Sequence, residues 1–290
     1  MRQIVVAAVA VVFIAAADSV AAQPMRTDPG ATTPVEVRYI DPVFHDVEVA
    51  YDVPYRQTID YLGNAVQLRL DIYQPAGDTA AQRPAIVWMH GGYFIFGDKR
   101  DMANYAKKFA RRGYVSISLQ YRLRPGISTG DLAGIAAAGY DAYEDATAGI
   151  SWLEEHANEY RIDPLNIAAG GYSAGAVTAL NLAYLPGNGR QRGSVIDAAV
   201  SIAGLSFGKP NAGEPPSIVF HGTADTTVPY SKGVEVCWQA LAVGSYCKLV
   251  TYQDAGHGIA YQFQHEIVRR TAKFMLARMI NRPPDAPAVT

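Results

Sequence analysis

The sequence lacks the motifs that mark several common kinds of active site. It contains no His-Glu-x-x-His pair, no cluster of cysteines and histidines, and no G-x-x-x-x-G-K-[ST] loop. The first two patterns supply zinc ligands, and the third binds nucleotide phosphates. The sequence therefore predicts neither a metal nor any other cofactor.

A strong excess of charge of either sign is absent as well. The chain has 25 Lys and Arg against 27 Asp and Glu, a net charge of −2, and only 18% of its 290 residues are charged. Proteins that bind nucleic acid usually carry a basic surface, so we expect no nucleic-acid partner. Apolar residues make up 49% of the chain, which is enough for one sizeable core in a single domain.

Long hydrophobic runs are missing except near the first residue. Ile4–Ala17 is a continuous apolar run between Arg2 and Asp18, and it is shorter than the roughly 20 residues that span a bilayer. Val20-Ala21-Ala22 has the small residues of a cleavage site. We therefore expect residues 1–22 to be a signal peptide and the protein to be secreted or periplasmic, with no stable membrane span after cleavage. A membrane anchor or a buried N-terminal helix is the alternative.

Cysteine is nearly absent, since only Cys237 and Cys247 occur. The segment between them has the pattern of a helix end, a turn at Gly244 and a strand start, which could bring the two α-carbons within bridging distance. Disulfides persist in the compartments that exported proteins reach. The sequence therefore predicts a disulfide, and two buried thiols are the alternative.

What the chain does have, from residue 85 onward, is a regular alternation of short apolar segments and helical ones. Such an alternation is typical of a parallel sheet covered on both faces. The predicted strands are Val47–Tyr51, Gln67–Tyr73, Ala85–Met89, Val115–Tyr121, Asn166–Ala169, Ala198–Ala203, Ser217–Phe220 and Lys248–Tyr252, and the predicted helices are Met102–Arg112, Tyr140–Tyr160, Ala174–Leu185, Ser231–Val243 and Ala260–Ile280. We expect an α/β domain over residues 23–290 with an antiparallel start, a loose lead-in at 23–34, a disordered tail at 283–290 and no large lid.

The most informative motif is Gly171-Tyr172-Ser173-Ala174-Gly175, which lies between a predicted strand and a predicted helix. A serine flanked by glycines at such a turn is typical of a nucleophile elbow. Ser173 would have a strained, positive-φ backbone, and side chains at positions 171 and 175 would collide with the strand or the helix. A glycine-rich strand end in another kind of α/β protein is the alternative.

A serine nucleophile needs a base, and the histidines after Ser173 are His221, His257 and His265. His257 lies in a loop just past a predicted strand, at the sheet edge where Ser173 also lies. His221 ends a strand, and His265 falls inside a helical pattern. We therefore predict His257 as the base, with an ordinary turn histidine as the alternative.

The base in turn needs a carboxylate that orients it. Asp225 follows the strand Ser217–Phe220 and so lies at the same sheet edge. Asp254 is the rival, but it is only three residues from His257 and would have difficulty facing the ring. Asp145, inside a predicted helix, is expected to be a surface or structural carboxylate. We predict Asp225 as the acid.

The negative charge that develops on a substrate oxygen needs preorganised backbone donors. The residue after the serine, Ala174, supplies one amide, and the loop His90-Gly91-Gly92-Tyr93 is placed to supply others. We predict an oxyanion hole from the amides of Gly92, Tyr93 and Ala174, with His90 and Gly91 bracing the loop. A plain strand-ending turn is the alternative for this loop.

Taken together, these motifs resemble the α/β-hydrolase superfamily, in particular carboxylesterase- and lipase-like members with an H-G-G oxyanion loop. The resemblance covers roughly residues 65–280 and lies in His90-Gly91-Gly92-Tyr93-Phe94, Gly97-Asp98-Lys99, Tyr121-Arg122-Leu123, Gly171–Gly175, His221-Gly222-Thr223-Ala224-Asp225, Val228-Pro229 and Gly256-His257-Gly258. Tyr93 stands where many members have a third glycine, as in some formamidase-like and feruloyl-esterase-like members. Gln120 stands where the usual D-Y-R-L-A-P-E run has aspartate.

The resemblance implies an α/β-hydrolase fold and an exported serine hydrolase that cleaves small-molecule carboxylic esters through an acyl-enzyme. An amide-cleaving or acyl-transferring relative, formamidase- or peptidase-like, is one alternative, and a hydrolase-fold binding protein is another. Five aromatic side chains flank the predicted catalytic loops, and for each a packing role is as well supported as substrate contact: Tyr93, Phe94, Phe96, Tyr172 and Tyr261.

Overall fold

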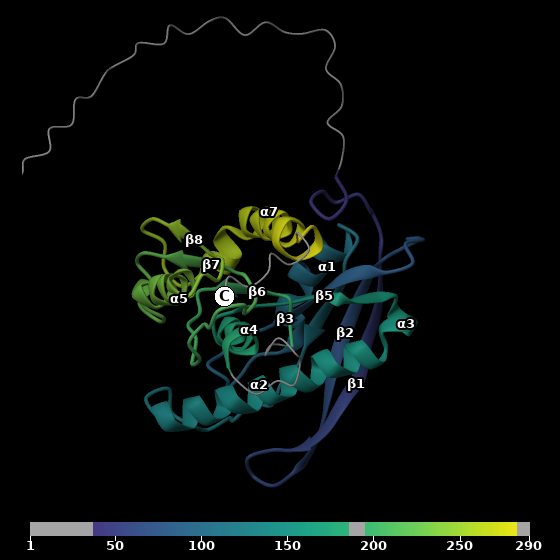
Figure 1. Ribbon diagram of the computed structural model, residues 1–290. Coiled ribbons are helices and arrows are strands. Elements are labelled where there is room, and N and C mark those ends of the chain that lie inside the picture. Colours follow the sequence, from purple (N-terminus) through teal and green to yellow (C-terminus); the bar gives the residue numbers. More distant parts are fainter. Residues whose placement is uncertain (1–36, 186–194, 283–290) are drawn as a thin grey trace, which may run out of the picture. The chain divides into compact units, whose positions relative to one another are not determined.

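The computed structural model describes residues 37–185 and 195–282 of the chain (Figure 1). The predicted signal peptide (1–22), lead-in (23–34) and tail (283–290) lie outside the described residues. None of the helices in the described ranges has the length and hydropathy needed to cross a bilayer.

The described residues contain one eight-stranded sheet, with the strand order β1-β2-β4-β3-β5-β6-β7-β8. Its strands are β1 (Val47–Ile59), β2 (Ala65–Pro75), β3 (Arg83–Met89), β4 (Val115–Leu119), β5 (Ile162–Tyr172), β6 (Ala198–Ile202), β7 (Ser217–Gly222) and β8 (Cys247–Tyr252). β2 pairs antiparallel with β1 and with β4, and all other pairs are parallel. The predicted fold class, a mainly parallel sheet with an antiparallel start, is confirmed.

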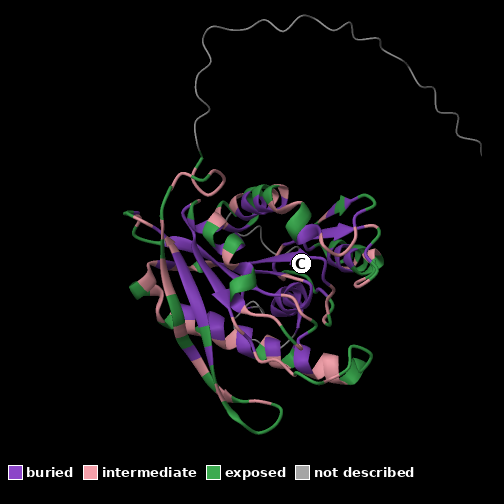
Figure 2. Cartoon of the chain, turned by 180° about the vertical axis from the view of Figure 1, so that it is seen from behind, coloured by how far each residue is buried: buried purple, intermediate pink, exposed green. Residues whose placement is uncertain are grey.

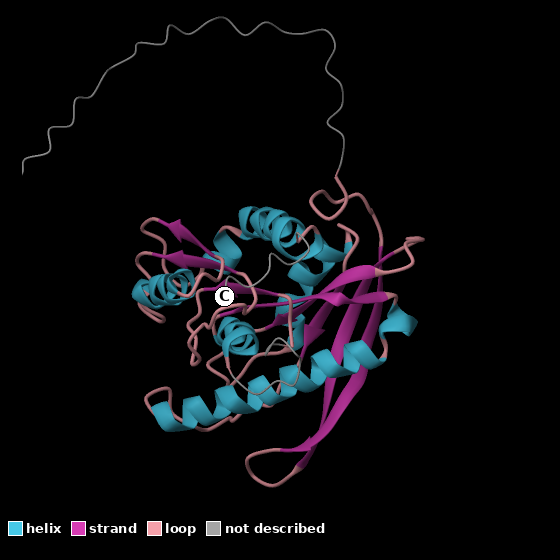
Figure 3. Cartoon of the chain, viewed as in Figure 1, coloured by secondary structure: helices cyan, strands magenta, loops and turns pink. Residues whose placement is uncertain are grey.

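Helices cover both faces of this sheet (Figure 3). They are α1 (Ala103–Ala110), α2 (Leu132–Glu155), α3 (Ala157–Tyr160), α4 (Ala174–Tyr184), α5 (Tyr230–Ala242), α6 (Ile259–Gln262) and α7 (Gln264–Met275), with short helices η1 (Lys99–Met102) and η2 (Leu276–Ile280). Trp88 and Phe220 belong to the core under α1 and α7, whereas Val87 and Val219 belong to the core under α2, α4 and α5. The central strands are therefore buried on both faces, as Figure 2 shows, which is why their sequences are mostly apolar.

Two predicted boundaries are wrong, and both have local causes. α2 begins at Leu132, eight residues before its predicted start, because the Asp131 carboxylate accepts a hydrogen bond from the Gly134 amide over 2.9 Å and caps the helix there. The predicted helix Ala260–Ile280 is divided into α6, α7 and η2, with a break at Phe263, whose backbone is not helical (φ −117°, ψ 23°).

The first strand also differs from its prediction. β1 continues to Ile59 rather than ending at Tyr51, and it pairs with β2 along its whole length, with irregularities in register after Ala50 and Pro54. Its later residues include polar side chains such as Arg56. β1 is the first strand of the sheet and has a neighbour on one side only, so it is partly exposed to water. Its sequence therefore does not have the continuous apolar pattern of the central strands.

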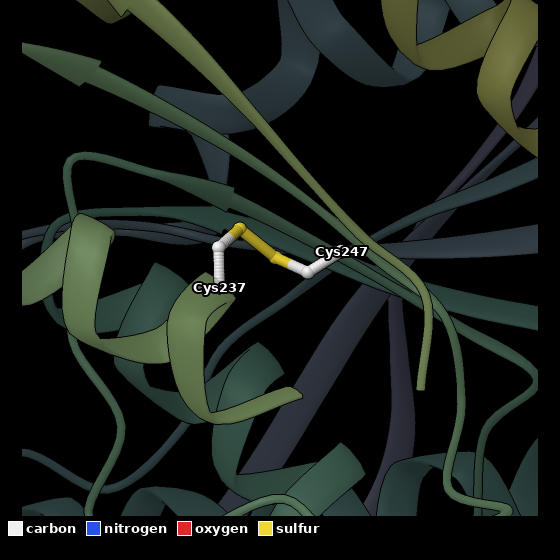
Figure 4. Close-up of a disulfide and its surroundings, with 2 residues drawn as sticks. All are labelled: Cys237 and Cys247. Carbon is white, nitrogen blue, oxygen red and sulfur yellow. A yellow bond between two sulfur atoms is a disulfide. The ribbon is translucent and has the colours of Figure 1, made fainter. Parts of the chain in front are cut away.

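Cys237 in α5 and Cys247 at the start of β8 are joined by a disulfide (Figure 4). Their α-carbons are 5.0 Å apart, and Gly244 makes the intervening turn with φ +78°. Glycine is favoured in this left-handed conformation because it has no β-carbon. The bond ties the helix that follows β7 to the strand that follows the helix.

Asp145, expected to be a surface or structural carboxylate, is buried in α2 and holds two arginines. Its carboxylate is 2.6 Å from Nη1 of Arg56 and 2.9 Å from Nε of Arg122, and it also accepts a hydrogen bond from the Arg122 amide over 2.8 Å. The side chain of Asp145 has no exposed surface. The network therefore fixes the chain just after β4 against α2 and β1.

Candidate active site

The turn that carries Ser173 joins the end of β5 to the start of α4. Ser173 has φ +54° and ψ −117°, a strained conformation for a residue with a side chain, and its amide donates to the Ile202 carbonyl over 2.9 Å. A β-carbon on Gly171 would lie 2.3 Å from the Gly175 carbonyl carbon, and one on Gly175 would lie 2.1 Å from the Met89 oxygen. Only glycine fits at either position, which explains the spacing of the motif.

Ser173, His257 and Asp225 lie together in one hydrogen-bonded line. Nε2 of His257 is 3.0 Å from Oγ of Ser173, and Nδ1 of His257 is 2.8 Å from Oδ2 of Asp225. The three residues follow the C-terminal ends of β5, β8 and β7, which meet at one edge of the sheet. The structure thus brings together the three residues that the sequence analysis proposed as nucleophile, base and acid.

The carboxylate of Asp225 is held in place by its own loop. Oδ1 accepts hydrogen bonds from the amides of Thr227 and Val228, each over 2.9 Å, and this leaves Oδ2 for His257. The carboxylate is fully buried, so these donors replace the water that an ionised group otherwise needs. Oδ2 of Asp225 accepts a hydrogen bond from Nδ1 of His257, so Nδ1 carries the ring proton. Nε2 of the neutral ring then faces the Ser173 hydroxyl without a proton.

The rival residues lie elsewhere. Asp254 accepts a hydrogen bond from the side chain of Gln253 over 3.1 Å, and its amide donates to Thr223 Oγ1 over 2.8 Å, so it shapes the loop before His257. His265 lies on α7 and is exposed. Neither residue contacts Ser173 within the described residues.

His221 lies on the far side of Asp225, a position that the sequence analysis did not anticipate. Its Nε2 donates to the Val228 carbonyl over 2.9 Å and is 3.4 Å from Oδ2 of Asp225. Burial lowers the pKa of His221, so the ring is neutral at pH 7. The i,i+4 spacing of His221 and Asp225 around a strand end was the available sequence signal.

The loop after β3 lies directly against Ser173. A β-carbon on Gly91 would be 3.2 Å from Cβ of Ser173, and Gly92 and Tyr93 have positive φ values of +113° and +54°. Among the described residues, the amides of Gly92, Tyr93 and Ala174 donate to no acceptor. Three unused N–H groups beside a serine hydroxyl can bind an anionic oxygen, which is the role predicted for them.

His90 is buried beneath this loop rather than exposed to a substrate. Its Nδ1 donates to the Gly91 carbonyl over 2.7 Å, its ring stacks on Tyr121 with the ring centres 4.3 Å apart, and the Tyr121 hydroxyl donates to its carbonyl over 2.7 Å. Burial lowers the pKa of His90, which keeps the ring neutral. These contacts fit a bracing role and leave His90 no access to the reacting atoms.

A polar chain continues behind His90. The amide nitrogen of Gln120 is 3.2 Å from Nε2 of His90, and Oε1 of Gln120 accepts from the Lys99 amide over 3.0 Å. Nζ of Lys99 lies 2.7 Å from Oδ1 of the fully buried Asp71 and 2.9 Å from Asp52. In the sequence, Gln120 and Lys99 stand out only as motif residues. Asp71 carries no such signal, because its partner Lys99 is remote in the chain.

Aromatic side chains surround the serine, but they do not all face solvent. Tyr93, Phe96 and Tyr261 are exposed, whereas Phe94 is buried against Tyr121. The Tyr172 hydroxyl donates to the His257 carbonyl over 3.3 Å, and burial raises the pKa of Tyr172 to about 12. Tyr172 is therefore a protonated phenol that packs beside His257, and it cannot itself serve as a base near neutral pH.

The segment that connects β6 to β7 forms no large lid over the C-terminal ends of the strands. The segment from residue 203 to residue 216 is described throughout and contains no helix. In the described ranges, no three His, Cys, Asp or Glu side chains gather in a way that could hold a metal ion.

A strained serine between β5 and α4, with a histidine and an aspartate after β8 and β7 of a mostly parallel sheet, defines an α/β-hydrolase fold. The BD-FAE family matches residues 70–204 of the chain. The structure is similar to esterase 2 of Thermogutta terrifontis phosphonylated by cyclosarin, with a TM-score of 0.66 and 26% identity over 83% of this chain and 96% of that one. The chain belongs to the carboxylesterase-like α/β-hydrolase superfamily.

Two curated proteins illustrate how the similarity is distributed. Esterase-5C of Drosophila miranda is 32% identical over 144 residues, which is 49% of this chain and 24% of that protein. A probable isoprenylcysteine alpha-carbonyl methylesterase of Arabidopsis thaliana is 26% identical over 255 residues, covering 70% of this chain and 51% of that protein. The chain thus spans between about a quarter and a half of the length of the curated relatives it matches.

Proposed function

We propose that the protein is an exported serine hydrolase that cleaves carboxylic esters of small molecules through an acyl-enzyme. The observation that carries the proposal is the line from Ser173 Oγ to His257 over 3.0 Å and from His257 to Asp225 over 2.8 Å. This arrangement can turn a weakly nucleophilic hydroxyl into a strong nucleophile. The names of the similar proteins, which include esterases and a methylesterase, support the choice of an ester bond.

In the first half of the reaction, Oγ of Ser173 attacks the ester carbonyl carbon while Nε2 of His257 takes the hydroxyl proton. The carboxylate of Asp225 keeps the proton on Nδ1 and stabilises the imidazolium that forms. The carbonyl oxygen becomes negative and accepts hydrogen bonds from the amides of Gly92, Tyr93 and Ala174. The bond to the alkoxy oxygen then breaks, and the alcohol leaves with the proton from His257.

In the second half, water takes the place of the alcohol. His257 removes a proton from the water, whose oxygen attacks the acyl carbon, and the ester bond to Ser173 breaks as its oxygen recovers the proton. Each free amide in the oxyanion site would contribute about 10²–10³ in rate. The reaction needs no metal or cofactor, because the chain supplies the nucleophile, base, acid and oxyanion donors.

Labelling with a fluorophosphonate tests the nucleophile. We expect one equivalent of probe on Ser173 in the folded protein, located by peptide mass spectrometry, and no labelling of Ser173→Ala or of heat-unfolded protein. A folded wild-type protein that never reacts would contradict the proposal and would favour a hydrolase-fold binding protein.

Paired substrates with the same acyl group test the bond that is cleaved. We expect hydrolysis of short acyl esters, including p-nitrophenyl acetate, at a much higher kcat/KM than of the matching anilides. Preferential cleavage of anilides would favour a formamidase- or peptidase-like enzyme, and acyl transfer to an added alcohol at the expense of hydrolysis would favour a transferase. Export is tested in a separate experiment. We expect a protein recovered outside the cytoplasm to begin near Gln23, which N-terminal sequencing would show.

A further inference from the structure

A cavity of about 280 Å³ is lined by residues of β8, α7 and η2. Tyr246 and Lys248, at the start of β8, form one side of it, whereas His257 follows the opposite end of the same strand. The two ends of a strand lie on opposite sides of a parallel sheet. Ser173 and His257 follow the C-terminal ends of their strands, so this cavity, at the N-terminal end of β8, is separate from the site at Ser173. Its volume is close to the lower limit of about 300 Å³ that is usual for small-molecule sites.

The cavity is lined by an unusual number of cationic side chains, which we call the basic groove: Lys248, Arg269, Arg270, Lys273 and Arg278. Only Arg270 has an acidic partner, Glu266, at 2.6 Å. The other four cations make no ion pair with any residue in the described ranges. The whole chain has a net charge of −2, so this concentration of positive charge is local and is not a consequence of composition.

Such a cluster is costly without an anion. Arg269 and Lys273 are one helical turn apart on α7, and like charges at that spacing destabilise a helix. The summed positive potential of a lined cavity attracts an anionic ligand, and bound anions relieve the repulsion. The groove is therefore better suited to the bound state than to the empty one.

One of the guanidinium groups is preorganised. The Arg278 guanidinium lies 3.8 Å from the ring centre of Tyr246, and that ring stacks on the buried ring of Phe274, at 6.2 Å with planes 19° apart. Stacking fixes the orientation of the planar guanidinium while leaving the N–H groups on its edge free to donate. Less side-chain freedom is then lost when an anion binds.

The groups in the groove also restrict the chemistry of the ligand. Lysine and arginine side chains are hydrogen-bond donors only, and no carboxylate of the lining is available as an acceptor. A neutral ligand rich in hydroxyls, which needs acceptors as well as donors, does not suit such a lining. Compact groups with several acceptor oxygens and negative charge do.

We propose that the basic groove binds a ligand that carries two or more phosphoryl oxyanions, at a site independent of the ester-hydrolysing one. Arg278 would donate two parallel hydrogen bonds to one phosphoryl group, and Arg269, Lys273 and Lys248 would neutralise the next. The same chemistry is presented by a soluble diphosphate and by the phosphates of two neighbouring headgroups on an anionic phospholipid surface. The proposal does not depend on the proposed esterase activity.

Inorganic pyrophosphate, followed by isothermal titration calorimetry at low and high salt, tests the soluble source. We expect saturable binding with one equivalent, weakened by added salt because the attraction is screened. Co-sedimentation with phosphatidylcholine vesicles containing phosphatidylglycerol tests the lipid source, against vesicles of phosphatidylcholine alone. Binding in either arm supports the proposal and identifies the source.

The variant Arg269→Glu/Lys273→Glu should weaken that binding at least tenfold while leaving ester hydrolysis unchanged. The matched control is Lys107→Glu/Arg111→Glu, which makes the same charge change at the same spacing at the C-terminal end of α1, and it should bind like the wild type. The proposal is overturned if neither ligand binds, or if the two double variants lose binding equally, since attraction to net charge alone would then explain the result.

Discussion

Gln120 donates a hydrogen bond to Nε2 of His90 over 3.2 Å, while Nδ1 of the same ring donates to the Gly91 carbonyl over 2.7 Å. Both ring nitrogens of the neutral His90 are therefore used, and the ring connects the end of β4 to the loop beside Ser173. A neutral amide suits this position, since it donates where the unprotonated nitrogen accepts. The aspartate found here in many relatives could not do so in its ionised form.

From this relationship we expect Gln120→Met to lower kcat about tenfold with little change in KM. Methionine keeps the length of the side chain but removes both the donor to His90 and the acceptor for the Lys99 amide. The loop then loses its support without losing an oxyanion donor, whose removal would cost about 10²–10³. Steady-state kinetics on a p-nitrophenyl ester measures the effect. Gln239→Met on α5, far from the loop, is the control, and an unchanged kcat in a well-folded Gln120→Met would refute the bracing role.

The acid can be distinguished from its rival by a pair of amide substitutions. Asp225→Asn should lower kcat by about 10⁴, because the asparagine amide would favour the wrong tautomer of His257. Asp254→Asn should leave kcat within about twofold, because among the described residues the Asp254 carboxylate accepts a hydrogen bond only from Gln253. Circular dichroism establishes that both variants are folded, and a larger loss for Asp254→Asn would mean that the assignment is reversed.

The buried carboxylate of Asp145 should contribute strongly to stability. Asp145→Asn leaves Arg56 and Arg122 without their shared anion, and breaking a buried ion pair typically costs about 3–5 kcal/mol. Urea denaturation measures the free energy of unfolding. Glu144→Gln removes an exposed partner of the same Arg122, so it should cost less than about 1 kcal/mol.

Removing the disulfide should destabilise the protein without abolishing its fold. Cys237 and Cys247 close a loop with a sequence separation of 10, for which the chain-entropy estimate is about 2–3 kcal/mol. Cys237→Ser/Cys247→Ser should therefore unfold at lower urea concentration. A reducing agent should shift the wild type to the same midpoint and leave the double variant unchanged; equal midpoints for all samples would mean that the bond contributes nothing.

Stability should also fall on mild acidification. Burial lowers the pKa of His90 and of His221 in the folded state, whereas an unfolded histidine has a pKa of about 6.5. Below pH 6.5 the unfolded chain therefore binds protons that these rings do not, and the free energy of unfolding decreases as the pH falls. Denaturation at pH 7.5 and pH 5.5 measures the slope, which should be shallower in His221→Gln and the same as wild type in His265→Gln, at an exposed position of α7.

Much of the fold and of the site could be predicted because the information is local. The strand ends, the glycines around Ser173 and the chain order of serine, aspartate and histidine are all properties of short segments, and a parallel sheet places such segments at one edge. The catalytic roles remain predictions until the nucleophile is labelled. The start of α2 could not be predicted from periodicity, since Leu132–Gly139 is uniformly small or apolar.

What the sequence could not predict depends on distant partners. Lys99, in η1, meets Asp71 because its carbonyl is held by Ser118 of β4, and β4 lies beside β2 in the sheet. No pattern within these segments specifies those neighbours. The contact of His221 with Asp225 is closer in sequence, but it depends on how the loop after β7 folds back. The basic groove likewise combines β8 with α7, which the sequence separates by the loop of His257.

The covalent link between α5 and β8 shortens the path through the chain from Asp225 to His257. Asp225 and His257 are 32 residues apart, and the cross-link bypasses 10 of those positions by joining the helix after the acid to the strand before the base. The shorter path lowers the entropy lost when the two side chains meet. Oxidation of the two thiols thus lowers the entropic cost of bringing Asp225 and His257 together.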